Sequence, residues 1–170
     1  LDLTKTPIQW DEIANLNDGM FLLRGEYRSM NLFYPPLFDV AAMIFFKVLG
    51  VSILSGRLIS VLFSLLSLWV LFELANNLYG WKTALVSSIL LGIMPGYIWL
   101  SRLALIETML VFFFILSMFF FFKWLRKNQD KMLVLSGLAL GLGFLAKYQM
   151  LIAGVIMILS ILFLARDHLR

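Results

Sequence analysis

The chain has 170 residues, of which 62% are hydrophobic and 14% are charged, and its mean hydropathy is +0.93. Soluble domains are only about 45–50% apolar, so this composition indicates a membrane protein. The formal net charge of +4 comes from short clusters between apolar runs and does not point to a nucleic-acid partner. The sequence has no cysteine for disulfide or thiolate chemistry. Its one histidine, His168, excludes a histidine-rich metal site within it.

Residues 1–53 hold the longest polar stretch and are expected to form a non-cytoplasmic loop that contains interfacial helices. Within them, residues 11–23 place apolar side chains at roughly helical spacing. This pattern predicts a helix that lies on the membrane surface, with its apolar face among the headgroups. Gly25 marks its expected end.

A second short helix is predicted directly after Pro35-Pro36, which can open a helix but not lie inside one. The apolar run Leu37–Leu49 would be about 20 Å long as a helix, whereas the hydrocarbon core is roughly 30 Å thick. It also contains Asp39 and Lys47, and Asp39 is expected to be solvated or paired. An interfacial or re-entrant helix is therefore favoured over a membrane crossing.

Residues 54–170 are expected to form a transmembrane bundle of about five helices, and the chain reads as a piece of a longer polytopic protein. Pro95-Gly96 predicts a kink or local unwinding in the second crossing. Gly137, Gly141 and Gly143 predict close helix packing through small residues. The expected crossings are residues 54–78, 81–100, 107–125, 132–146 and 150–165.

The loop at residues 126–131 is the most basic and should be cytoplasmic by the positive-inside rule. Counting crossings outward from it, with residues 37–49 left out, places a set of polar residues together on the non-cytoplasmic face. These residues are Asp11, Glu12, Tyr34, Arg102, Glu107 and Lys147.

Carboxylates beside a lysine and an arginine suit a ligand that carries phosphate. One carboxylate can act as general base on an acceptor hydroxyl, and the cations can neutralise a phosphate leaving group. Three of these residues also have a purely structural interpretation. Asp11 could be a helix N-cap, Glu107 could stabilise a helix N-terminus, and Lys147 could extend to the headgroups.

Five segments resemble a known family in their order along residues 10–148: WDEIANLNDG, FYPPLF, FKVLGVSILSGRLIS, PGYIWLSRLALIETML and LGLGFLAKY. The chain resembles the polyprenyl-phosphate-sugar-dependent GT-C glycosyltransferases, in the group of protein O-mannosyltransferases and aminoarabinose transferases. The resemblance implies an all-α polytopic membrane protein with a GT-C-like helix bundle. It implies that Asp11 is catalytic, that Glu107 is a second acidic site residue and that Lys147 lies near the lipid phosphate. Aminoarabinose transferases have Glu-Lys where this chain has Phe33-Tyr34.

The expected function is therefore an inverting sugar transfer from a polyprenyl- or dolichyl-phosphate donor. Asp11 would act on the acceptor hydroxyl, with Glu107 supporting it or a cation, and the two carboxylates should share one cavity. Lys147 and Arg102 would bind the donor phosphate, and Glu12, Tyr34 and Tyr148 would contact substrate.

The only cofactor that these residues suggest is a divalent metal cation, for which Asp11 and Glu107 would be the ligands. The expected partners are the lipid-linked donor, a protein, lipid or glycan acceptor and the membrane, without nucleic acid. The expected location is the cell membrane or an endoplasmic-reticulum-type membrane, with the site on the non-cytoplasmic face. The alternative is a transporter or assembly subunit, whose charged residues would line a path near the bilayer midplane.

Overall fold

The computed structural model describes residue 3, residues 7–26 and residues 34–168, with side chains as far as residue 163. This part of the chain is helical, as predicted, and helix ends lie within a few residues of the expected ones. The helices are α1 (Trp10–Arg24), α2 (Leu37–Leu49), α3 (Ile53–Tyr79), α4 (Trp81–Ile93), α5 (Pro95–Ser101), α6 (Glu107–Lys127), α7 (Asp130–Ala146), the 3-10 turn η2 (Tyr148–Met150) and α8 (Leu151–His168).

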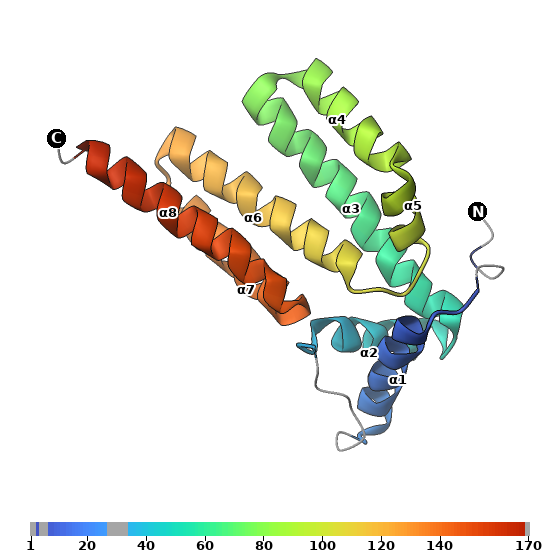
Figure 1. Ribbon diagram of the computed structural model, residues 1–170. Coiled ribbons are helices and arrows are strands. Elements are labelled where there is room, and N and C mark those ends of the chain that lie inside the picture. The colour runs from blue at the N-terminus through green and yellow to red at the C-terminus, as the bar shows by residue number, and fades with distance from the viewer. Residues whose placement is uncertain (1–2, 4–6, 27–33, 169–170) are drawn as a thin grey trace.

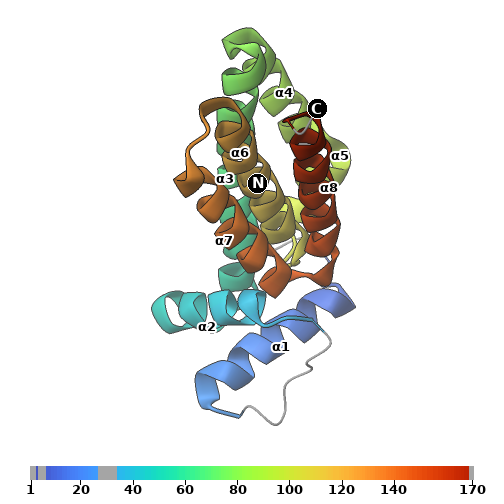
Figure 2. The same cartoon turned by 90° about the vertical axis from the view of Figure 1, so that its left-hand side faces the viewer.

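Helices α1 and α2 lie across one end of a bundle formed by the later helices (Figure 1). Figure 2 shows α2 running crosswise to α3, α6 and α7. With 13 residues, α2 is also too short to span a bilayer. This orientation is the one expected of a helix at the membrane surface. It agrees with the prediction that residues 37–49 do not cross the membrane. Gly25 ends α1 in the left-handed conformation (φ 74°), as predicted.

Two helices in the described part of the chain, α3 and α6, are long and apolar enough to cross a membrane. Helices α4 and α5 make a third crossing if they are one broken span, bent by 67°. The break falls where predicted, because Pro95 has no N–H to donate and the residue before it, Met94, is extended. The expected number of about five crossings stays a prediction.

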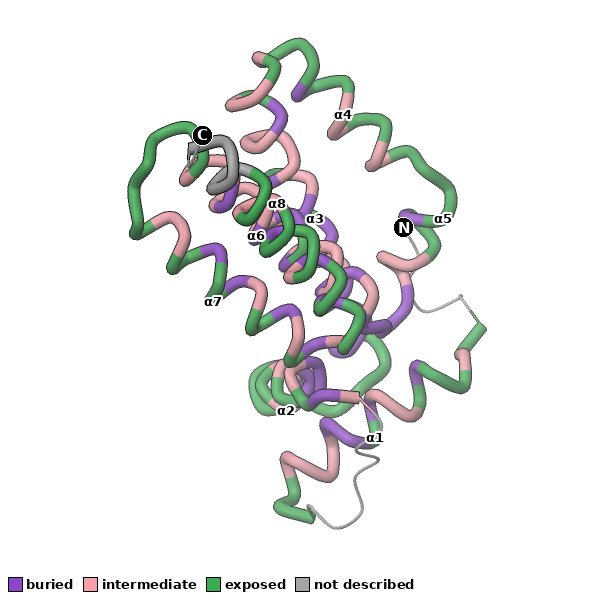
Figure 3. Tube along the Cα trace, turned by 60° about the vertical axis from the view of Figure 1, so that its left-hand side comes forward, coloured by how far each residue is buried: buried purple, intermediate pink, exposed green. Residues whose placement is uncertain are grey.

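The outer faces of α4 and α8 are exposed over most of their length (Figure 3). Most of the exposed side chains there are apolar, among them Leu85, Val86, Ile89 and Leu90 on α4 and Ile152, Val155, Ile156 and Leu159 on α8. Continuous apolar surface of this extent is typical of helices that face lipid or other membrane helices. The fold is therefore that of an all-α membrane protein.

A buried hydrophobic cluster lies where α1 and α2 meet the bundle. Phe38 and Ala42 of α2 are fully buried there, together with Ile59 of α3. Two glycines bring the helices close together. A Cβ at Gly19 of α1 would lie 2.5 Å from the Cβ of Ala42, and one at Gly56 of α3 would lie 2.2 Å from a methyl group of Leu16. This packing fixes the position of α1, and with it the polar residues of its first turn.

The predicted glycine packing on α7 is wrong for two of its three residues. A Cβ at Gly137 or Gly141 would meet no described atom within 4 Å, whereas one at Gly143 would meet Met150 at 2.8 Å. Helix α7 packs against α6 on a different face, where Ser136 donates a hydrogen bond to the carbonyl of Ser117 (2.9 Å). The spacing of the glycines did not show which face the neighbouring helix covers.

The basic residues before α7 lie at the end of the bundle opposite to α1 and α2. There, Arg126 donates a hydrogen bond to the carbonyl of Asn77, near the end of α3. Helix α7 starts at Asp130 instead of the expected residue 132, because an acidic residue is favourable in the first turn of a helix.

We expect cysteines that replace Trp10 and Tyr148 to be labelled from one side of the membrane and one that replaces Lys127 from the other. These three positions are exposed, and the first two lie at the opposite end of the bundle from the third. Labelling of the full-length protein in sealed vesicles with an impermeant maleimide measures this. Labelling of positions 10 and 127 from the same side would contradict the arrangement.

Candidate active site

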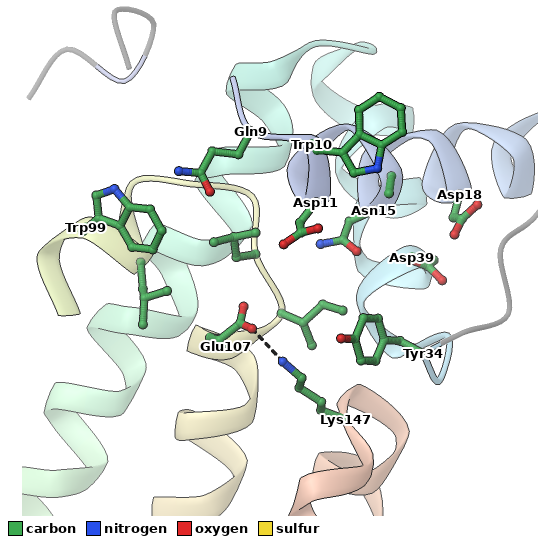
Figure 4. Close-up of a pocket in the computed structure, with 14 residues that line it drawn as sticks. Gln9, Trp10, Asp11, Asn15, Asp18, Tyr34, Asp39, Trp99, Glu107 and Lys147 are labelled. Carbon is green, nitrogen blue, oxygen red and sulfur yellow. Dashed lines mark hydrogen bonds and ion pairs between the residues drawn. The ribbon is translucent and has the colours of Figure 1, made fainter. Parts of the chain in front are cut away.

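A cavity of about 340 Å³ lies between α1, α2, the loop before α6 and the ends of α6 and α7 (Figure 4). Asp11 and Glu107 line this cavity together, as expected, and Lys147 and Tyr34 line it with them. The complete lining is Gln9, Trp10, Asp11, Ala14, Asn15, Asp18, Tyr34, Asp39, Trp99, Leu100, Leu105, Ile106, Glu107 and Lys147. Residues that are distant in sequence thus meet at one end of the bundle.

Asp11 is the second residue of α1, and its side chain is available to interact with a ligand in the cavity. The N-cap of α1 is Gln9, so the interpretation of Asp11 as a helix cap is wrong. Figure 4 shows its carboxylate pointing into the cavity, near the amide of Asn15. Asn15 lies one turn further along α1 and donates a hydrogen bond to the carbonyl of Ala104 (3.3 Å). The cavity wall that carries Asp11 is thereby attached to the loop that precedes α6.

Glu107 and Lys147 form an ion pair on the opposite wall, with 2.6 Å between Lys147 Nζ and Glu107 Oε1. Glu107 is the first residue of α6, where the helix dipole favours a carboxylate. Lys147 directly follows α7, and its side chain is 12% exposed. Its ammonium also lies 5.2 Å from the centre of the Tyr34 ring. Lys147 therefore extends into the cavity and not outward to the headgroups.

Glu12, the neighbour of Asp11, is fully buried and does not line the cavity. Its Oε1 accepts hydrogen bonds from Arg57 Nε (2.6 Å) and from the backbone N–H of Ala104 (2.9 Å). Its Oε2 accepts from Arg57 Nη2 (2.8 Å) and, at 3.4 Å, from the backbone N–H of Gln9. Glu12 thus joins α1 to α3 and to the loop before α6. Its expected role in substrate binding does not match this position.

The pKa of Glu12 reflects these partners. Burial by itself would raise it, but the hydrogen bond from Arg57, that from Ala104 and the charge of Arg57 outweigh burial and hold the pKa below its usual 4.5. A carboxylate with a lowered pKa stabilises the fold above its unfolded pKa, and this contribution is lost as the pH falls through the folded pKa. Glu12 is therefore a charged structural group at neutral pH.

Asp39 of α2 is only 7% exposed and lines the cavity, and the expected pairing is absent among the described residues. Burial, and secondarily the nearby charge of Asp18, raise the pKa of Asp39 to about 7. Asp39 is consequently one of the functional candidates that sequence reasoning missed. A carboxylate in the first turn of a largely apolar helix was the available signal.

Two of the predicted residues lie away from this cavity. Arg102 lines a neighbouring cavity of about 320 Å³ with Pro95, Ile98 and Trp99, and Trp99 lines both cavities. Tyr148 is 48% exposed, and its ring packs against that of Phe144 at a centroid distance of 5.5 Å. Their roles toward phosphate and substrate stay predictions.

The residues at the cavity are a poor fit for a divalent cation. Among the described residues, no three histidine, aspartate or glutamate side chains lie close enough to hold a metal ion together. Such ions take several oxygen ligands, whereas Glu107 already binds the ammonium of Lys147. We therefore assign no step to a metal, and the cation stays a prediction.

Comparison with known families agrees with the resemblance seen in the sequence. Residues 34–170 match the family described as dolichyl-phosphate-mannose-protein mannosyltransferase. The chain belongs to this family. Because it belongs to this family, the chain is related to the glycosyltransferases of the GT-C type. The match includes Glu107 and Lys147 but begins after Asp11, which is placed at the site by the structure. Searches of curated proteins and of solved structures gave no match.

We expect Glu12→Gln to lower the free energy of unfolding by about 3–5 kcal/mol, because it removes the negative charge that neutralises the buried guanidinium of Arg57. Denaturant unfolding of the full-length protein in detergent measures this. Asp11→Asn, at the next residue, is the control and should change stability by less than about 0.5 kcal/mol, since Asp11 is exposed. Equal stabilities of the two variants would show that the buried pair does not hold α1.

Proposed function

We propose that this cavity transfers a sugar from a polyprenyl- or dolichyl-phosphate donor to a hydroxyl group of a protein acceptor, on the non-cytoplasmic face. The observation that carries the proposal is the single cavity that brings together the exposed carboxylate of Asp11 and the Lys147–Glu107 ion pair. Family membership independently supports a lipid-linked donor and a protein acceptor.

Asp11 is the proposed general base. Its carboxylate takes the proton of the acceptor hydroxyl while the hydroxyl oxygen bonds to the first carbon of the sugar. The bond from that carbon to the phosphate oxygen breaks, and its electron pair leaves with the lipid phosphate. Attack from the face opposite to the leaving group inverts the configuration at this carbon.

Lys147 is the proposed phosphate-binding residue. Its ammonium carries three N–H donors, and the described contacts use one of them on Glu107. The others can reach a phosphate oxygen and stabilise the charge that develops there as the bond breaks. Glu107 has the supporting role, because its ion pair holds the ammonium at the cavity wall.

The size of the cavity suits the sugar and phosphate groups of the donor but not its lipid chain. At about 340 Å³ it lies at the lower end of the range for small-molecule sites, about 300–1,000 Å³. The sugar and phosphate groups can be enclosed there, whereas the long lipid chain must extend outside. The apolar surfaces of the bundle are the natural place for that chain.

The alternative of a transporter or assembly subunit is less well supported. Such proteins place charged residues along a path near the bilayer midplane. Here the described polar cluster lies at one end of the bundle, beside α1 and α2 (Figures 1 and 4).

We expect Asp11→Asn to reduce sugar transfer by a factor of about 10²–10⁴, because the amide keeps the shape of the side chain but cannot accept the proton. Transfer from a panel of lipid-phosphate sugars by the purified full-length protein measures this. Asp130→Asn, at the opposite end of the bundle, should keep normal activity. Full activity of a correctly folded Asp11→Asn variant would disprove the assignment of Asp11 as base.

We expect Lys147→Ala to raise the KM for the donor about tenfold or more, with a smaller effect on kcat. The reason is that its charged hydrogen bond to phosphate is present in both the ground state and the transition state. Steady-state kinetics with varied donor measure the two constants separately. Lys127→Ala, at the other end of the bundle, is the matched control. An unchanged donor KM in Lys147→Ala would place the phosphate elsewhere.

A further inference from the structure

The carboxyl group of Asp39 is the polar group of the cavity that the proposed transfer does not use. Its residue is only 7% exposed, and it accepts no hydrogen bond from any of the described residues. The carboxyl oxygens themselves reach the cavity, and a hydrogen-bond donor on a ligand there can bind them.

The groups that face Asp39 leave it without a described counter-charge. From α1 come Asp18 and Asp11, both acidic, and Asp18 has an interaction of its own. Tyr34 lies beside α2 and is uncharged. The cation that lines the cavity, Lys147, is bound to Glu107 on the other wall. The side of the cavity near Asp39 is therefore acidic.

The position of this acidic side relates it to the acceptor. In Figure 4, Asp11 lies above the Glu107–Lys147 pair, and Asp18 and Asp39 lie on the side of the cavity away from Glu107. In an inverting displacement the acceptor approaches from the side opposite to the leaving phosphate. If the phosphate lies at Lys147, the body of the acceptor extends past Asp11 toward Asp39.

We propose that Asp39, with Asp18 beside it, forms an acceptor subsite that recognises a positively charged group next to the reacting hydroxyl. This inference rests on the proposed function, because the transfer defines which side the acceptor occupies. A basic side chain of a protein acceptor would supply the counter-charge that the described residues do not provide. An acidic one would be repelled. The subsite thus selects hydroxyl residues in basic sequence context.

The titration of Asp39 gives the subsite a pH dependence. Burial and the charge of Asp18 raise its pKa to about 7, so the carboxyl is partly protonated at neutral pH. A cationic ligand favours the charged form. Affinity for a basic acceptor should therefore rise as the pH increases through about 7, and affinity for a neutral acceptor should change little.

Three threonine peptides that differ only in the residue beside the threonine test the proposal: lysine, alanine or glutamate. Both the Kd for each peptide and sugar transfer to it are measured with the full-length protein in detergent. The lysine peptide should bind about tenfold or more tightly than the glutamate peptide, a difference typical of one partly buried charge pair. Asp39→Asn should remove most of this preference, whereas Asp130→Asn, far from the cavity, should keep it.

The two measurements separate failure of the subsite from failure of the transfer. Transfer to all three peptides without charge preference would overturn the subsite and leave the proposed function intact. Preferential binding of the lysine peptide without any transfer would support the subsite and count against the transfer. Failure of all three to bind, or a preference that survives in Asp39→Asn, would overturn the inference.

Discussion

The buried ion pair between Glu12 and Arg57 is the constraint on which the rest of the site depends. Burying two charges is costly unless their hydrogen-bonding groups are satisfied. Here the carboxylate of Glu12 accepts from Arg57 through both oxygens and also from the backbone N–H of Ala104. The pair therefore joins α1, α3 and the loop before α6 at one point. Its geometry determines where Asp11 and Glu107 lie relative to one another.

A division of roles among the acidic residues follows from this constraint. Successive residues of a helix point about 100° apart, so Glu12 can face the protein interior while Asp11 faces the cavity. Glu107 begins the helix that follows the anchored loop, and it holds Lys147 in turn. Asp39 lies on the helix packed beneath α1 and lacks a described partner. Glu12 is thus structural and Glu107 holds Lys147, whereas Asp11 and Asp39 are available to substrates.

Much of the fold could be predicted from the sequence, because apolar runs, prolines and glycines determine helix length and helix ends locally. The common location of Asp11, Glu107 and Lys147 could also be predicted, since it requires only the order of the helices. The partner of Glu12 could not, because Arg57 is 45 residues away and the pairing depends on packing. The burial of Asp39 and the separate cavity of Arg102 depend in the same way on how α2 and α5 pack.

A structure of the full-length protein with a lipid-phosphate sugar bound, determined by electron cryomicroscopy in lipid nanodiscs, tests the central claim most directly. We expect the phosphate within hydrogen-bonding distance of Lys147 Nζ, and the first carbon of the sugar on the side that faces Asp11. Donor density at the opposite end of the bundle, near Arg126 and Lys127, would contradict the assignment of this cavity as the active site.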